Sequence, residues 1–162
     1  YKNFTSMSWV YSCGAGANYG TALESALKIG ETIHIPSCCY EIEEYIHGPN
    51  LQLTPQYNVI FFDGNDGASR RVEQVYKATR KVSNRAYLIS NNPQLSSDDH
   101  VLSLSDTVSS ELCPLVYLPF VQLLSFIISD DLHSIYQHPL LKEFKAIAAA
   151  KTENFVNYDG DD

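Results

Sequence analysis

The sequence predicts an α/β fold in which a parallel sheet is covered by helices on both faces. Short apolar, β-prone runs alternate along the chain with helical patterns, and the first run leads into a glycine-rich turn. Strands that are buried on both faces form continuous apolar runs, as residues 58–62 (NVIFF) do. With 162 residues and 44% hydrophobic residues, the chain has the size and composition of one globular domain.

In the first half, the elements follow from glycine positions and apolar runs. Residues 8–13 are expected to form a buried strand, and the glycines of 14–20 permit a tight turn. A helix is expected from residue 19 or 21 to about residue 30. The run 58–62 is expected to be a strand that ends at the turn-rich segment 63–67.

In the second half, the periodicity predicts two helices and two strands. Residues 69–82 form an amphipathic pattern, and 86–89 and 100–104 are expected to be strands. Residues 114–130 are expected to form a nearly all-apolar helix, buried on several sides.

Charge and hydropathy argue against two kinds of partner, nucleic acid and a membrane. The net charge is −8, and the only adjacent basic residues are Arg70-Arg71 and Arg80-Lys81, so nucleic acid is not an expected partner. The longest apolar run, 112–128, is interrupted by two prolines and a glutamine. We therefore expect no membrane-spanning segment.

The four cysteines give neither a zinc-binding pattern nor a disulfide framework. Cys13 and Cys113 are expected to be small core residues, whereas Cys38 and Cys39 are adjacent. With no signal peptide, a cytoplasmic protein is expected. Because Tyr1 is not an initiator methionine, the chain is expected to be a piece of a longer polypeptide.

Two carboxylates, a lysine and a histidine form the candidate catalytic group. Glu24, Lys28 and Glu31 are spaced i, i+4 and i+7, so in a helix they share one face, and His47 follows a turn. A carboxylate near a histidine suits proton transfer on a small substrate. The same spacing also fits a solvated surface ion pair, and His47 could simply pack a turn.

The glycine-rich turn supplies a second candidate. Gly16 and Asn18 lie where the first helix begins, and a helix N-terminus can receive an anion. Tight turns also need glycine for their own geometry, so this pattern alone does not decide between the two interpretations.

Three motifs together resemble the sugar-isomerase (SIS) domain family. They are Cys13-Gly14-Ala15-Gly16, the segment 22–31 (ALESALKIGE) and His47-Gly48-Pro49. In order and spacing they are similar to the second SIS domain of glucosamine-6-phosphate synthase and of fructosamine-type phosphosugar deglycases. The apolar segment 114–124 resembles the last helix of that domain.

This resemblance implies a three-layer α/β/α sandwich with a five-stranded parallel sheet of flavodoxin type. It implies an SIS domain over residues 1–135, the C-terminal one of a tandem pair, and a tail over 136–162 that closes over an active site. No cofactor or metal is implied. The partners implied are a phosphorylated sugar, the missing N-terminal SIS domain and further copies in a homo-oligomer.

The family's chemistry is an aldose–ketose proton shuttle on ketose or amino-sugar 6-phosphates. By resemblance, Glu31 moves the proton between the first two sugar carbons and His47 helps to open the ring in a neighbouring subunit's site. Glu24 and Lys28 match positions that support the site. Lys151 matches a tail lysine that approaches the sugar, although it could equally be a solvated lysine.

One departure from the family limits what this chain can do alone. The family holds the substrate phosphate with a Ser-x-Ser-Gly-x-Thr loop of the first domain, and this sequence has no such loop. A phosphosugar isomerase, a deglycase or the isomerase part of an aminotransferase all fit the motifs. The alternative is a non-catalytic domain that binds sugar phosphate for regulation or serves in dimerisation.

Overall fold

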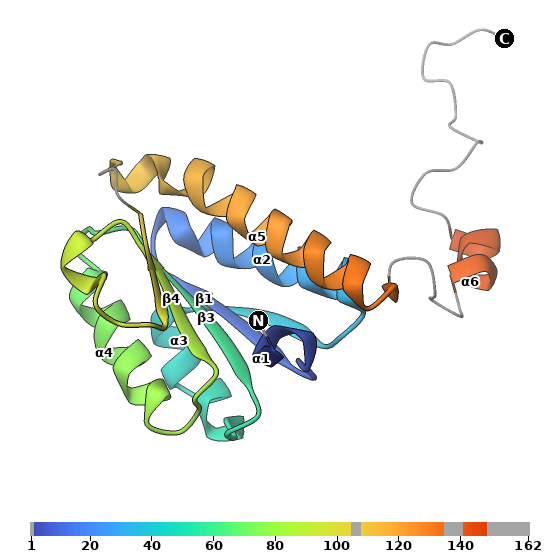
Figure 1. The fold of residues 1–162 in the computed structure, drawn as a ribbon, viewed down its shortest axis with the longest axis horizontal. Coiled ribbons are helices and arrows are strands. Elements are labelled where there is room, and N and C mark those ends of the chain that lie inside the picture. Colours follow the sequence, from blue (N-terminus) through green and yellow to red (C-terminus); the bar gives the residue numbers. More distant parts are fainter. Residues whose placement is uncertain (1, 105–107, 135–140, 149–162) are drawn as a thin grey trace, which may run out of the picture.

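A five-stranded, entirely parallel sheet forms the centre of the molecule in the computed structural model, which describes residues 2–104, 108–134 and 141–148 (Figure 1). The strand order is β2-β1-β3-β4-β5, the order of flavodoxin-type folds. The fold class expected from the sequence is confirmed. The strands are β1 (Val10–Gly14), β2 (Ser37–Glu41), β3 (Asn58–Asp63), β4 (Ala86–Ser90) and β5 (Val101–Ser103).

Helices cover both faces of this sheet and complete the three layers. Helices α2 (Ala17–Ile33) and α5 (Cys113–Asp131) lie side by side on one face, and α3 (Ile42–Ile46) and α4 (Ser69–Arg80) lie on the other (Figure 1). Each pair buries its own apolar cluster against the sheet. The remaining helices are α1 (Lys2–Thr5), α6 (Leu141–Ala148) and the 3₁₀ turns η1 (Pro49–Gln52), η2 (Pro93–Leu95) and η3 (Ser110–Leu112).

The turn from β1 into α2 depends on two glycines. Gly16 has a φ of 56°, in the left-handed region that favours glycine. A Cβ atom at Gly14 would lie 2.2 Å from the carbonyl oxygen of Asn18, so no side chain fits there. These glycines let the chain reverse tightly and begin α2 at the carboxyl end of β1.

Helix α2 turns its small and branched residues toward the sheet. Ala22, Ala26, Ile29 and Ile33 are buried at a spacing of three or four residues. The helix ends at His34, whose left-handed backbone (φ 64°) lets its N–H donate to the carbonyl oxygen of Gly30 at 3.2 Å. The opposite side of α2 is therefore left for the candidate site.

Among the elements that were not predicted from the sequence, one strand and one helix lie between the first helix and the second predicted strand. Strand β2 at the sheet edge and helix α3 after it occupy 37–46, where no helix or strand was expected. Every residue of β2 is half-buried, so the strand lacks both the alternation and the continuous apolar run that identify strands. Cys13 and Cys113 are buried core residues, as expected, and Cys38 and Cys39 on β2 are half-buried.

The expectation about membrane spans is wrong as far as length and composition go. The helical stretch Ser110–Asp131 is long and apolar enough to cross a bilayer by those criteria alone, and 33% of its apolar window is buried. The prolines do not interrupt it, because Pro114 lies in the first turn and the helix continues through Pro119. Such a helix also arises as a core helix of a soluble domain, and this one packs on α2.

The predicted boundary at 135/136 stays a prediction. Most of the predicted tail 136–162, including Lys151, lies outside the described residues, and only α6 belongs to the described part. Phe144 and Ile147 of α6 are exposed.

Candidate active site

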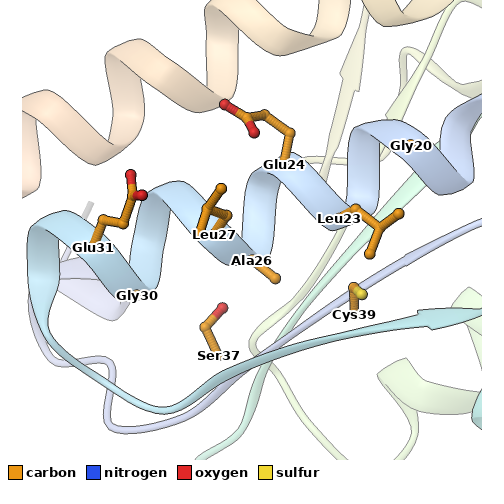
Figure 2. Close-up of a pocket in the computed structure, with 9 residues that line it drawn as sticks. All are labelled: Gly20, Leu23, Glu24, Ala26, Leu27, Gly30, Glu31, Ser37 and Cys39. Carbon is orange, nitrogen blue, oxygen red and sulfur yellow. The ribbon is translucent and has the colours of Figure 1, made fainter. Parts of the chain in front are cut away.

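A shallow hollow of about 740 Å³ lies between the outer side of α2 and the edge strand β2 (Figure 2). In Figure 2, Leu23 and Ala26 point toward β2, while the carboxylates of Glu24 and Glu31 project from the opposite side of the helix. The lining residues are Gly20, Leu23, Glu24, Ala26, Leu27, Gly30, Glu31, Ser37 and Cys39. The hollow is open to solvent, so a second surface would be needed to enclose a ligand there.

The structure brings Glu24, Lys28 and Glu31 together as the sequence spacing predicts. Lys28 Nζ lies 2.7 Å from Glu31 Oε2 and 3.5 Å from Glu24 Oε1. The lysine thus stands between one carboxylate a turn before it and another a turn after it, and the three side chains carry one net negative charge. Glu31 lines the hollow, but its carboxylate projects from the side of α2 that faces away from β2.

Electrostatics keep Lys28 protonated. The hydrogen bond to Glu31 has the largest effect and raises the pKa of Lys28; burial lowers that pKa, but the charges of Glu24 and Glu31 raise it further, so the net direction is upward. An ammonium group that is always charged can orient a carboxylate but cannot accept a proton. In this group, proton acceptance therefore belongs to the carboxylates.

Glu31 is not buried within this chain. Half of its side chain (50%) is exposed, compared with 30% for Lys28 and 32% for Glu24. A carboxylate becomes a stronger base for a carbon-bound proton when water is excluded around it. The candidate site thus holds Glu24, Lys28 and Glu31 in a fixed arrangement, but no second surface excludes water from the Glu31 carboxylate.

His47 lies on the other face of the sheet from Glu31. It ends α3 and is exposed, and its Nδ1 lies 2.7 Å from the carbonyl oxygen of Glu43. Because a carbonyl oxygen only accepts, Nδ1 carries the proton in this contact, and Nε2 is left as the acceptor. Within one chain, His47 and Glu31 cannot act on the same substrate atom.

Gly16 and Asn18 lie at the other end of α2 from Glu31. Asn18 is buried and its Oδ1 accepts from Thr21, while its Nδ2 lies near Gly64 and has no hydrogen-bond partner among the described residues. Thirteen residues of helix separate Asn18 from Glu31, which is about 20 Å at 1.5 Å per residue. One small ligand would therefore contact one end of α2 or the other.

Known proteins with the same fold identify the domain type. A candidate phosphosugar isomerase from Clostridium difficile superposes with a TM-score of 0.79 and 20% identity, over 93% of this chain and 42% of that one. The C-terminal domain of glucosamine-fructose-6-phosphate aminotransferase from Francisella tularensis gives 0.71 and 22%, over 80% and 37%. The chain thus has the fold of an SIS domain.

Sequence comparison also finds proteins of this kind. Glutamine–fructose-6-phosphate aminotransferase (isomerizing) from Xylella fastidiosa is 27% identical over 125 residues, which are 76% of this chain and 20% of that protein. The chain thus spans about a fifth of the length of the curated relatives it matches. No protein-family model matches the chain.

Sequence reasoning missed a buried polar network at the carboxyl ends of β3 and β4. The Asp63 carboxylate is fully buried and accepts hydrogen bonds from the hydroxyls of Ser69 and Ser90. Tyr117 of α5 donates to the Asp63 carbonyl oxygen at 2.7 Å. An aspartate directly after a buried strand was the available signal. The network fastens α5 to the sheet.

Ser37 and Cys39 of the hollow were also missed, because β2 was not recognised as a strand. Burial raises the pKa of the Cys39 thiol, and the neighbouring Cys38 acts in the same direction. Cys39 therefore stays a neutral thiol. Its half-buried side chain lines part of the hollow. Among the described residues, no group of three or more His, Cys, Asp or Glu side chains is arranged to hold a metal ion.

Proposed function

We propose that this SIS domain is the C-terminal half of an enzyme that moves a proton on a ketose or amino-sugar 6-phosphate. Glu31 takes the proton from one of the first two sugar carbons and returns it to the other, so no net proton is gained or lost. The observation that carries the proposal is the Lys28 ammonium group, which lies 2.7 Å from the carboxylate of Glu31, a residue that lines an open hollow. Lys28 supplies orientation, and Glu24 shares its charge.

The phosphate of the substrate needs more groups than this domain supplies at the hollow, where Ser37 is the one hydroxyl residue among the nine that line it. Lys28 is the only cationic side chain among the nine lining residues and their salt-bridge partners, and two carboxylates already neutralise it. A phosphate dianion is held by convergent N–H groups, hydroxyls or cations. We therefore assign phosphate binding to the missing N-terminal SIS domain of a longer, cytoplasmic enzyme.

The first prediction tests Glu31 in the intact protein. Glu31→Gln keeps the shape of the side chain but removes the base, so turnover of fructose 6-phosphate should fall by roughly 10²–10⁴. Exchange of the sugar's C1 and C2 hydrogens with deuterated solvent should fall equally. The matched control is Glu73→Gln, which breaks a similar exposed helical ion pair, with Lys77 at 3.1 Å, on the other face.

Turnover and hydrogen exchange together distinguish an enzyme from a non-catalytic domain that binds sugar phosphate. Turnover and exchange within a few-fold of wild type in Glu31→Gln would sink the assignment of the base. If the intact wild-type protein bound the sugar phosphate but neither turned it over nor exchanged its hydrogens, a non-catalytic regulatory domain would be the correct reading.

The second prediction concerns His47, which we assign to a site completed by another subunit. Glu31→Gln and His47→Asn should each be inactive alone. Mixed dimers of the two variants contain one site with both native residues, so mixing them should restore about a quarter of wild-type activity. A mixture as inactive as its components, with mixed dimers shown by mass spectrometry, would rule out a shared site.

A further inference from the structure

The imidazole ring of His47 completes the C-terminal end of α3. A helix leaves its last four carbonyl oxygens without the usual backbone partners. The backbone N–H of His47 donates to the carbonyl oxygen of Glu44 at 3.1 Å, so the carbonyl oxygen of Glu43 lacks the donor that a regular helix would give it. The ring of His47 takes that place, since its Nδ1 lies 2.7 Å from the Glu43 oxygen. The position of Glu43 therefore decides where Nε2 of the exposed His47 ring points.

Glu43 itself is held from two directions. Its backbone N–H donates to Oε2 of Glu41 at 2.6 Å, a contact that caps the start of α3. Its carboxylate accepts two hydrogen bonds from Arg71 of α4, from Nε to Oε1 at 2.6 Å and from Nη2 to Oε2 at 3.0 Å. Of these two attachments, the one with Arg71 joins Glu43 to a residue 28 positions away in the sequence.

Helix α3 depends on such attachments because it is short. It has five residues, and an isolated helix of that length is not stable in water. Ile42 and Tyr45 bury its inner side, and the Tyr45 hydroxyl lies 3.2 Å from the Thr79 hydroxyl of α4. The pair of Arg71 and Glu43 supplies a second attachment to α4, nearer the solvent. Two attachments to the same helix fix the rotation of α3 about its axis as well as its position.

The two-bond geometry distinguishes this pair from an ordinary surface ion pair. Both side chains are about half exposed, 43% for Arg71 and 51% for Glu43, and most ion pairs at such positions contribute little. A guanidinium group that donates two hydrogen bonds to one carboxylate also fixes the angle between the two groups. Hydrogen bonds from Arg71, aided by its charge, lower the pKa of the Glu43 carboxyl against an opposing effect of burial. The pair therefore stays ionised at neutral pH.

We propose that Arg71 is a positioning residue that acts through Glu43 to hold the His47 ring with its proton on Nδ1 and Nε2 free to accept a proton from the sugar. This rests on the proposed function, in which His47 serves the site of another subunit. Ring opening moves the proton of the anomeric hydroxyl to Nε2 and then to the ring oxygen, as the bond between that oxygen and the anomeric carbon breaks. No net proton is gained or lost. A ring with its proton on Nε2 would offer a donor where an acceptor is needed.

The first measurement is the tautomer of His47, which does not depend on activity. In the intact protein labelled with ¹⁵N, long-range ¹H–¹⁵N NMR spectra at alkaline pH show which nitrogen of a neutral imidazole carries the proton, and His47→Asn identifies the signals. The wild type should carry the proton on Nδ1, whereas Arg71→Gln should give a mixture of both tautomers. The matched control is Arg70→Gln, which removes the same charge from the preceding, exposed position and should keep the wild-type tautomer.

Kinetics of the intact protein with fructose 6-phosphate test the same contact. Arg71→Gln should lower kcat about three- to tenfold and leave KM within about twofold, because the orientation of His47 affects the chemistry more than sugar binding. Arg71→Lys keeps the charge without the two-bond geometry and should lose nearly as much. Glu43→Gln should match Arg71→Gln, and the double variant should lose no more than either, because all three remove one contact. Arg70→Gln should behave as the wild type.

A sugar that cannot close its ring separates this role from a general effect on the enzyme. 5-Deoxyfructose 6-phosphate lacks the hydroxyl that forms the ring, so Arg71→Gln should turn it over as fast as the wild type does. An equal loss on both sugars would overturn the proposal, as would losses that multiply in the double variant. A wild-type tautomer in Arg71→Gln, with His47→Asn inactive, would overturn the role of Arg71 alone. Full activity of His47→Asn would instead overturn the proposed role of His47 itself.

Discussion

The two helical layers of this domain differ in how their outer surfaces are finished. On the α3/α4 side, charged residues face water and pair: Arg71 makes two hydrogen bonds to Glu43, at 2.6 and 3.0 Å, and Lys77 pairs with Glu73. On the α2/α5 side, the outer surface is largely apolar, and its charges are gathered in the Glu24–Lys28–Glu31 group and at the ends of α5. Both layers bury comparable apolar clusters inward.

The difference teaches that inward packing does not distinguish a functional face from a structural one. Each helix pair packs apolar residues against the sheet, but only α3 and α4 also present mainly charged and polar residues to water. The layer that leaves apolar surface exposed is also the layer that holds the candidate base.

The comparison is tested most strongly within α5 itself. Ile128 is fully buried against the sheet, whereas Phe126 is 61% exposed two residues earlier. Ile128→Ala should lower the free energy of unfolding by about 2–5 kcal/mol, because it leaves a cavity. Phe126→Ala should change it by less than about 1 kcal/mol in the isolated chain. Urea unfolding followed by circular dichroism measures both.

The matched pair makes the result easy to interpret. Should Phe126→Ala cost as much as Ile128→Ala, the outer side of α5 would be packed within this chain. In that case the outer side of α5 would not be a free surface.

A smaller effect is expected on the α3/α4 side, where a tyrosine binds an ionised carboxylate. Tyr76 donates to Asp98 Oδ2 at 2.8 Å. Burial tends to raise the pKa of Asp98, but hydrogen bonds from the His100 N–H and from Tyr76 outweigh it and hold that pKa below its usual value. A lowered carboxyl pKa stabilises the fold above the unfolded-state pKa, and this stability is lost as pH falls through the folded-state pKa.

Tyr76→Phe should therefore cost about 1 kcal/mol or less at pH 7 and progressively less below about pH 4. Tyr45→Phe is the control, because Tyr45 shares its hydrogen bond with the neutral Thr79 hydroxyl at 3.2 Å, so its cost should not depend on acid pH. Urea unfolding at pH 7 and at pH 3 gives both differences. A pH-independent cost for Tyr76→Phe would show that Asp98 does not gain its charge stabilisation from this tyrosine.

The sequence could predict the elements whose burial is uniform or periodic. β1 and β3 are buried at every position, and α4 buries Val72, Val75, Tyr76 and Thr79 at helical spacing. The spacing of Glu24, Lys28 and Glu31 also carried over directly, because an α-helix fixes which residues share a face. Features that depend only on neighbouring residues in the chain could therefore be predicted from the sequence.

The elements that sequence reasoning missed depend on long-range contacts. β2 is recognisable only through its pairing with β1, in which Tyr11 lies opposite Cys38 and Ser12 opposite Cys39. The separation of His47 from Glu31 follows from which face of the sheet each helix covers, and neighbouring positions in sequence gave no sign of it. Proximity along the chain had suggested one site, whereas the fold places the two residues in different layers.

The position of α5 in the chain has a consequence for biosynthesis. Its inner residues Tyr117, Val121 and Ile128 complete the cluster that Val10, Ile60 and Ile89 begin. At about 5–20 residues per second, a ribosome needs roughly 2–8 seconds to travel from Ile89 to Ile128. During that interval the apolar residues that α5 will bury remain exposed to solvent. When α5 emerges, it adds apolar residues on both of its sides. The nascent chain is thus most in need of a chaperone just before its last core helix docks.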